Sequence, residues 1–138
     1  QGMMEAAAAE KGDLKILAVT ALTSLDEGDI KDLGFACDVQ ELVVSRARRA
    51  LSSGCDGIVA SGMELEYIRD EVSDKLLIVT PGIRPVENRP TDDQKRIVSV
   101  EQAFKRGADY IVVGRPIKNA ANPRQAAELI QKKILSAI

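Results

Sequence analysis

Four short apolar segments recur along this chain, each followed by a stretch with helical character, and this alternation limits the folds that are open to it. The expected strands are residues 14–20, 57–61, 76–80 and 110–113. The last has β-branched and aromatic side chains without alternation, which is typical of a strand buried on both faces. Strands that alternate with helices predict a parallel sheet with right-handed crossovers.

The expected helices are marked by their amino-terminal residues. A helix without a preceding strand is predicted for residues 1–10, and another for 63–72. Residues 25–32 are interpreted as an acidic loop, and 86–94 form the longest stretch without periodicity. The other three helices begin with a residue that can accept a backbone N–H, followed three positions later by Glu or Gln: Asp38 with Glu41, Ser99 with Gln102, and Asn122 with Gln125.

Two architectures fit this order of elements. One is a small doubly wound sheet, and the other is half of a (β/α)₈ barrel, for which about 250 residues are typical. Four βα units in 138 residues suit half a barrel. The pattern alone does not choose between the two.

Glycine and arginine occur together at the ends of two consecutive strands. Gly82 and Arg84 follow the third expected strand, and Gly114 and Arg115 follow the fourth. In either architecture ligands gather at the carboxyl ends of the strands. Glycine lets the backbone approach a ligand, and the guanidinium fork fits a phosphate. These ends predict a phosphate clamp, with a plain turn and a solvated arginine as the alternative. Gln94 fits either a residue closing over that phosphate or a solvated loop residue.

Composition excludes several classes of function. The chain contains no histidine, so Ser-His-Asp and Cys-His catalysis and the common His-ligated zinc sites are not encoded. Cys37 and Cys55 lack metal-ligand spacing, and free thiols in a reducing cytoplasm are expected.

The charge pattern points away from nucleic acids and membranes. The net charge is −2, there is no block of like charges, and no apolar run is long enough to cross a bilayer. We therefore expect neither a nucleic acid nor a membrane as a partner. The basic residues outside the strand ends are interpreted as solvated surface: Arg46, Arg48, Arg49, Lys95 and Arg96.

Five segments together resemble the bacterial type of orotidine 5′-monophosphate decarboxylase: 17–24, 54–61, 80–85, 92–94 and 107–117. The most specific combination is Thr-Pro-Gly-Ile-Arg-Pro at 80–85 followed by Val-Val-Gly-Arg-Pro-Ile at 112–117. The resemblance runs from residue 1 to the end of the chain. It implies an α/β fold that is the C-terminal half of a TIM (β/α)₈ barrel. Residues 1–138 would be one partial domain of four parallel βα units preceded by a helix.

The resemblance also implies a role for individual residues. Thr23 would touch the orotate base, while Arg84, Gln94, Gly114 and Arg115 would hold the nucleotide phosphate. The family removes CO₂ from orotidine 5′-monophosphate to give UMP in pyrimidine synthesis, without a metal or organic cofactor. A lysine protonates the carbanion that develops at the base, and binding energy from the remote phosphate stabilises the transition state. Members typically work as homodimers.

The family's catalytic lysines and aspartates, which include an Asp-x-Lys-x-x-Asp motif on early strands, have no counterpart here. Asp29-Ile30-Lys31-Asp32 has the wrong spacing, so we expect no catalytic residue in this chain and no turnover by it alone. Because a half barrel leaves its sheet edges unpaired, it should need either the missing N-terminal half or a second copy. Alternatives are a sugar-phosphate decarboxylase of the same superfamily, which would use metal, and a non-catalytic phosphate-binding or self-assembling half barrel.

Overall fold

The computed structural model describes residues 1–84 and 95–138, and in this part of the chain helices and strands alternate as the sequence predicts. The strands are shorter than expected, because only part of each expected segment pairs with a neighbouring strand. The elements in chain order are α1 (Gly2–Ala9), β1 (Leu17–Val19), α2 (Glu27–Asp32), α3 (Val39–Ser52), β2 (Gly57–Val59), α4 (Leu65–Glu71), β3 (Leu77–Thr80), α5 (Val100–Lys105), β4 (Tyr110–Ile111), α6 (Arg115–Lys118) and α7 (Pro123–Ala137).

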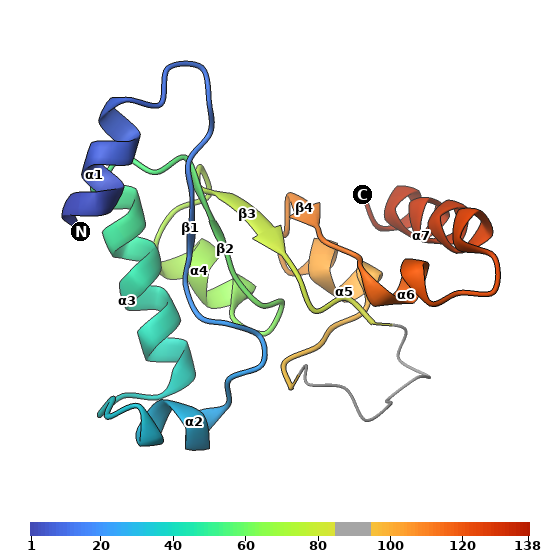
Figure 1. Ribbon diagram of the computed structural model, residues 1–138, viewed down its shortest axis with the longest axis horizontal. Coiled ribbons are helices and arrows are strands. Elements are labelled where there is room, and N and C mark those ends of the chain that lie inside the picture. The colour runs from blue at the N-terminus through green and yellow to red at the C-terminus, as the bar shows by residue number, and fades with distance from the viewer. Residues whose placement is uncertain (85–94) are drawn as a thin grey trace.

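The order of the strands decides between the two predicted architectures. All four strands are parallel, and their order in the sheet, β1-β2-β3-β4, is the order of the chain. A doubly wound sheet reverses its strand order at a switch point, whereas a (β/α)₈ barrel adds each strand beside the previous one. Helix α1 lies at the β1 end of the molecule and α7 at the β4 end (Figure 1). The fold is therefore part of a barrel.

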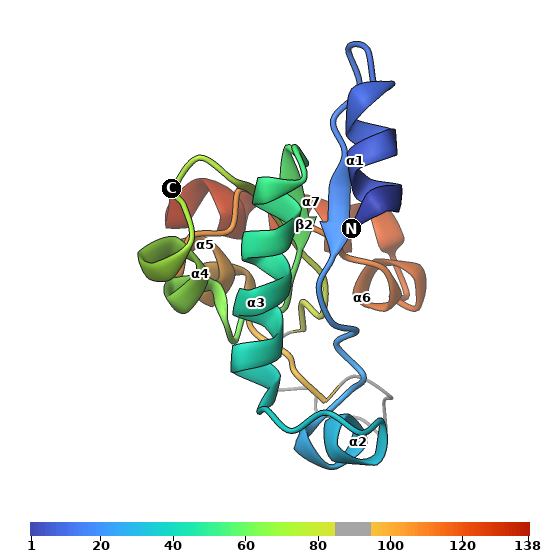
Figure 2. The same ribbon diagram turned by 90° about the vertical axis from the view of Figure 1, so that its left-hand side faces the viewer.

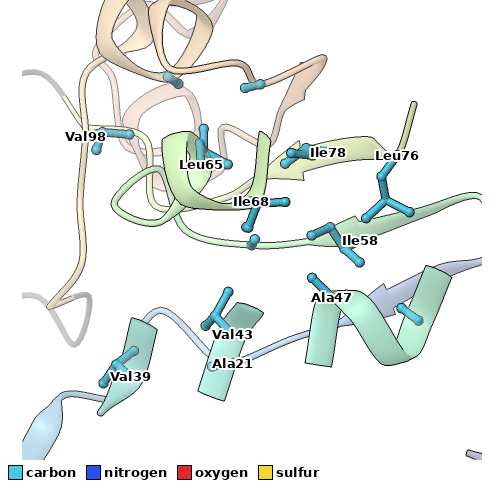
Figure 3. Close-up of a cluster of buried hydrophobic side chains, with 14 of the residues drawn as sticks. Ala21, Val39, Val43, Ala47, Ile58, Leu65, Ile68, Leu76, Ile78 and Val98 are labelled. Atoms are coloured by element: carbon cyan, nitrogen blue, oxygen red, sulfur yellow. The ribbon is translucent and has the colours of Figure 1, made fainter. Parts of the chain in front are cut away.

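The hydrophobic core lies between the sheet and helices α3 and α4. Ile58 of β2 and Ile78 of β3 are register partners and have no exposed surface. Ala47 of α3 and Ile68 of α4 lie close to Ile58 (Figure 3), and both are fully buried. In the view of Figure 2, α3 runs in front of β2. Each helix buries one apolar stripe against the same face of the sheet, as the helices in the outer layer of a barrel do.

The opposite face of the sheet carries apolar side chains that remain open. Leu17 and Val19 of β1 are exposed, and so are Tyr110 of β4 and Val112 just beyond it. The prediction that residues 110–113 are buried on both faces is therefore wrong for this chain. Among the described strands β4 pairs with β3 alone, and the side chains of Tyr110 and Val112 are each more than half exposed. In a closed barrel that face is the filled interior.

The three predicted helix starts are confirmed. Asp38 and Ser99 each form a capping box with the residue three positions on, and the Asn122 side chain accepts the N–H of Gln125. The interpretation of residues 25–32 as a loop is wrong, because they contain α2. That helix begins with a capping box of its own, between Asp26 and Asp29, and it buries Ile30.

Two aspartates fasten neighbouring strands at their amino ends, and we call these contacts the carboxylate clasps. Asp56, just before β2, accepts the backbone N–H of Ile16, just before β1, at 2.9 Å. Asp109, just before β4, accepts the N–H of Ile78 in β3 at 2.7 Å and the guanidinium of Arg69 at 2.8 Å. The clasps lie at the end of the sheet away from the predicted phosphate clamp.

Candidate functional site

Thr23 lies at the carboxyl edge of the sheet, in the turn after β1, and is buried. Its carbonyl oxygen accepts the N–H groups of Lys95 and Arg96, each at 3.2 Å. A Cβ placed on Gly82 would lie 3.6 Å from the Thr23 methyl carbon. The turn after β1 therefore packs directly against the turn after β3, although β2 separates these two strands in the sheet.

The turn after β3 is held in a narrow space. Gly82 has a φ of +76°, a conformation that side-chain-bearing residues rarely adopt, and a Cβ there would come within 2.9 Å of the Arg96 carbonyl oxygen. The backbone N–H of Arg84 donates to the carbonyl of Val98 at 3.0 Å, and the N–H of Val98 donates to Gly82 at 3.2 Å. Main-chain hydrogen bonds on both sides of Ile83 thus fix the backbone from which the Arg84 side chain projects.

Gly114 stands at the fourth strand end, immediately before α6. A Cβ placed on it would meet no atom of residues 1–84 or 95–138 within 4 Å. Packing against the described residues therefore does not require glycine at this position. Arg115 opens α6 and is exposed, and Pro116 follows it. The open space over Gly114 suits the close approach of a ligand to the main chain.

A cavity of about 210 Å³ brings the ends of β3 and β4 together. Arg84 lines it from one strand end, and Val113 and Pro116, which flank Gly114 and Arg115, line it from the other. Ser99, at the start of α5, and Lys133 of α7 also line it. Arg84 thus shares a cavity with the neighbours of Gly114 and Arg115, and most of the other residues that line this cavity are apolar.

Sequence reasoning missed a buried ion pair at this edge. Arg96, interpreted as surface, has a side chain only 9% exposed, and its Nη1 donates to Glu64 Oε1 at 2.7 Å. Its Nη2 donates to the carbonyl oxygens of Leu22 at 2.9 Å and Ala21 at 3.3 Å. Burial raises the pKa of the Glu64 carboxyl, and the Arg96 guanidinium opposes that rise. The basic run Lys95-Arg96 carries no periodic signal that separates a buried residue from an exposed one.

The arginines of α3 are exposed, as the sequence predicts, and one of them also contacts the end of β1. Arg46, Arg48 and Arg49 are exposed, but Arg46 also donates to the carbonyl of Thr20 at the end of β1. Its guanidinium carbon lies 5.5 Å from the centre of the Phe35 ring, a cation–π distance. Arg46 thus joins α3 to the strand end that leads to Thr23.

Some of the sequence predictions concern residues outside the described part of the chain. Gln94 lies outside residues 1–84 and 95–138, so the structure says nothing of its place. Within the described residues, no group of three or more His, Cys, Asp or Glu side chains is arranged to hold a metal ion. No helix among the same residues is both long and apolar enough to span a membrane.

A parallel sheet in chain order with helices over one face defines part of a (β/α)₈ barrel. The sequence profile of the orotidine 5′-phosphate decarboxylase / HUMPS family matches residues 1–130. The chain belongs to this family.

Individual relatives agree with this assignment. The chain is 67% identical over 132 residues to orotidine 5′-phosphate decarboxylase of Methylococcus capsulatus, which covers 96% of this chain and 54% of that protein. The same enzyme of Nitrobacter winogradskyi is 50% identical over 138 residues, covering 99% and 57%. The chain thus spans about half the length of the curated relatives it matches.

Solved structures give the same fold. Orotidine 5′-phosphate decarboxylase from Lactobacillus acidophilus superposes with a TM-score of 0.71 at 36% identity, covering 87% of this chain and 49% of that one. The protein of that name from Pyrococcus horikoshii gives a TM-score of 0.62 at 30% identity, covering 91% and 53%. The barrel expected from the sequence is confirmed.

Proposed function

We propose that this chain is the phosphate-binding half of an orotidine 5′-phosphate decarboxylase, and that the intact protein converts orotidine 5′-monophosphate to UMP and CO₂. The observation that carries the proposal is the meeting of Arg84 with the residues flanking Gly114 and Arg115 around one cavity. Family membership and the identity to named decarboxylases support the substrate.

In this proposal each strand end has its own task. Arg84 and Arg115 supply guanidinium donors to the phosphate, and the open space over Gly114 lets the phosphate reach the main chain. Gln94 adds a further phosphate contact. Thr23, which follows β1, contacts the base, whereas the phosphate residues follow β3 and β4. Holding the phosphate contributes binding energy that the reacting end of the substrate uses in its transition state.

The catalytic lysines and aspartates belong to the missing half, so this chain alone is inactive and requires no cofactor of its own. Its open sheet face is covered by that half in the intact enzyme, which works as a homodimer. A reducing cytoplasm is the compartment that suits the free thiols of Cys37 and Cys55. Neither nucleic acid nor membrane takes part.

Titration calorimetry of the 138-residue chain with UMP and with uridine tests the retained site. We expect UMP to bind and uridine, which lacks the phosphate, to bind far more weakly. Arg115→Ala should abolish UMP binding. Arg124→Ala is the matched control, because Arg124 is exposed on α7 and forms an ion pair with Glu128 four residues on. Equal UMP binding by Arg115→Ala and the unchanged chain would contradict the phosphate clamp.

A complementation assay tests the enzymatic part of the proposal. The chain is mixed with the amino-terminal portion of the Methylococcus capsulatus relative, and loss of orotidine 5′-monophosphate absorbance is followed. Decarboxylation is expected from the mixture and from neither part alone. Turnover by the 138-residue chain without any other polypeptide would refute the inactive-half proposal.

A further inference from the structure

The guanidinium of Arg96 joins the turns that follow β1 and β2, two strands that pair with each other in the sheet. One nitrogen donates to Glu64, which stands directly before α4 and beyond β2. The other donates to the carbonyls of Ala21 and Leu22, beyond β1. The next carbonyl along, that of Thr23, accepts the backbone N–H of Arg96 itself. Arg96 therefore contacts the turn that ends in Thr23 through both its side chain and its main chain.

Stability alone gives a poor account of this ion pair. Glu64 and Arg96 are both buried, and within the described residues Glu64 Oε2 and Arg96 Nε have no hydrogen-bond partner. A buried ion pair recovers its desolvation cost only when its remaining polar atoms are also satisfied. An imperfectly satisfied pair that fixes a turn carrying a binding residue suggests a positioning role.

We infer that Glu64 and Arg96 are positioning residues that hold the turn at Thr23 in place for the base of the substrate, and that they do not act on the phosphate. This inference rests on the proposed function. Its geometric basis is the reach of the guanidinium, which contacts the ends of β1 and β2. The proposed phosphate clamp lies at the other two strand ends, because Arg84 follows β3 and Arg115 follows β4.

Two ligands separate these ends of the site. UMP presents both the base and the phosphate, whereas ribose 5-phosphate presents the phosphate without a base. Calorimetry with the 138-residue chain compares the two. Arg96→Met removes the guanidinium, and we expect UMP binding to weaken on the order of tenfold, the loss typical of hydrogen bonds to a charged group, with ribose 5-phosphate binding unchanged. Glu64→Gln should likewise weaken the binding of UMP relative to that of ribose 5-phosphate.

Lys95→Ala is the matched control. Lys95 is the neighbouring residue and also forms an ion pair, but its ammonium lies at the surface, 2.8 Å from both Asp26 and Asp29. Its backbone N–H, which donates to Thr23, remains in the variant. We expect both ligands to bind Lys95→Ala as they bind the unchanged chain.

A second variant keeps the test decisive if removing one buried charge unfolds the chain. Glu64→Leu combined with Arg96→Met replaces both charges by apolar side chains of similar volume, a change that buried ion pairs often tolerate. The selective loss of UMP affinity is expected again. Equal weakening of both ligands, or of neither, would overturn the inference.

Ligand binding by the unchanged chain separates failure of the positioning inference from failure of the proposed function. If it binds ribose 5-phosphate as tightly as UMP, the phosphate clamp stands but the base is not read, and the positioning inference is overturned. If it binds neither ligand, the proposed function itself fails and the inference fails with it.

Discussion

The carboxylate of Asp56 accepts the backbone N–H of Ile16 at 2.9 Å and so ties the start of β2 to the start of β1. The ammonium of Lys11 lies 2.7 Å from the same oxygen. The hydrogen bond from Lys11 and the bond from Ile16 lower the pKa of Asp56 to about 2, from an ordinary value of 3.8. The first clasp is therefore strongest when Asp56 is ionised.

Acid should loosen this clasp in a defined pH range. Because the folded pKa of Asp56 lies below the unfolded value, its stabilising contribution is complete above about pH 4 and is lost as the pH falls towards 2. Asp56→Asn should unfold at lower urea concentration at pH 7 and show a smaller further loss between pH 4 and 2. Lys95 lowers the pKa of Asp26 to about 2 as well, so Asp56→Asn should keep the part of the acid response that comes from Asp26. Asp13→Asn, at an exposed carboxylate, is the control. An unchanged acid response in Asp56→Asn would refute this assignment.

The second clasp should be comparably important. Asp109→Ala leaves the N–H of Ile78, a fully buried residue, without its acceptor and also removes the ion pair with Arg69. An unsatisfied buried donor costs about 1–3 kcal/mol, so the free energy of unfolding should fall by that amount. Urea denaturation measures it, with Asp74→Ala on the exposed loop before β3 as the control. Equal stabilities of the two variants would argue against the clasp.

Two glycines should respond to alanine in opposite ways. A Cβ at Gly57 would lie 2.6 Å from Leu77 Cβ and 2.7 Å from Leu17 Cδ2, so Gly57→Ala should destabilise the sheet by about 1–3 kcal/mol or more. A Cβ at Gly114 would meet no atom of the described residues within 4 Å, so Gly114→Ala should keep its stability while UMP binding weakens. Thermal unfolding and calorimetry on both variants check the contrast. Unchanged UMP affinity in Gly114→Ala would remove Gly114 from the site.

The open apolar face predicts self-association of the isolated chain. Val19, Tyr110 and Val112 are each more than half exposed on this face, and exposed apolar patches of this kind promote association. Sedimentation velocity should show species that grow with concentration, and Val112→Lys should shift them towards monomer. Leu135→Lys, at a position on α7 that is 73% exposed, should leave the distribution unchanged. A strictly monomeric unchanged chain would contradict this prediction.

Much of the fold was predictable because its signals are local. The caps at Asp38, Ser99 and Asn122 mark helix starts through contacts within one turn, and all three are confirmed. Helix α2 was missed because its acidic residues and Gly28 are typical of a loop, although Asp26 and Asp29 form a capping box of the same kind. Strand order follows from long-range pairing, which periodicity does not encode, and it was the strand order that distinguished the barrel.

The candidate site was predictable where it depends on topology and hidden where it depends on packing. Parallel strands bring their carboxyl ends to one edge, so the neighbourhood of Arg84 and Gly114 follows from the order of elements. The burial of Arg96 does not, because its partners Glu64 and Leu22 are far from it in the sequence and no periodic pattern joins them. The space that the described residues leave around a Cβ at Gly114 likewise becomes visible only in three dimensions.

The carboxylate clasps lie at one end of the strands, and the residues proposed to meet the substrate lie at the other. Substitutions at the strand ends that carry Thr23 and Gly114 therefore leave Asp56 and Asp109, and the register they fix, in place. Mutations can therefore change which ligand such a barrel binds without changing the hydrogen bonds that join its strands. This separation gives the half barrel room to diverge in specificity while its scaffold is inherited unchanged.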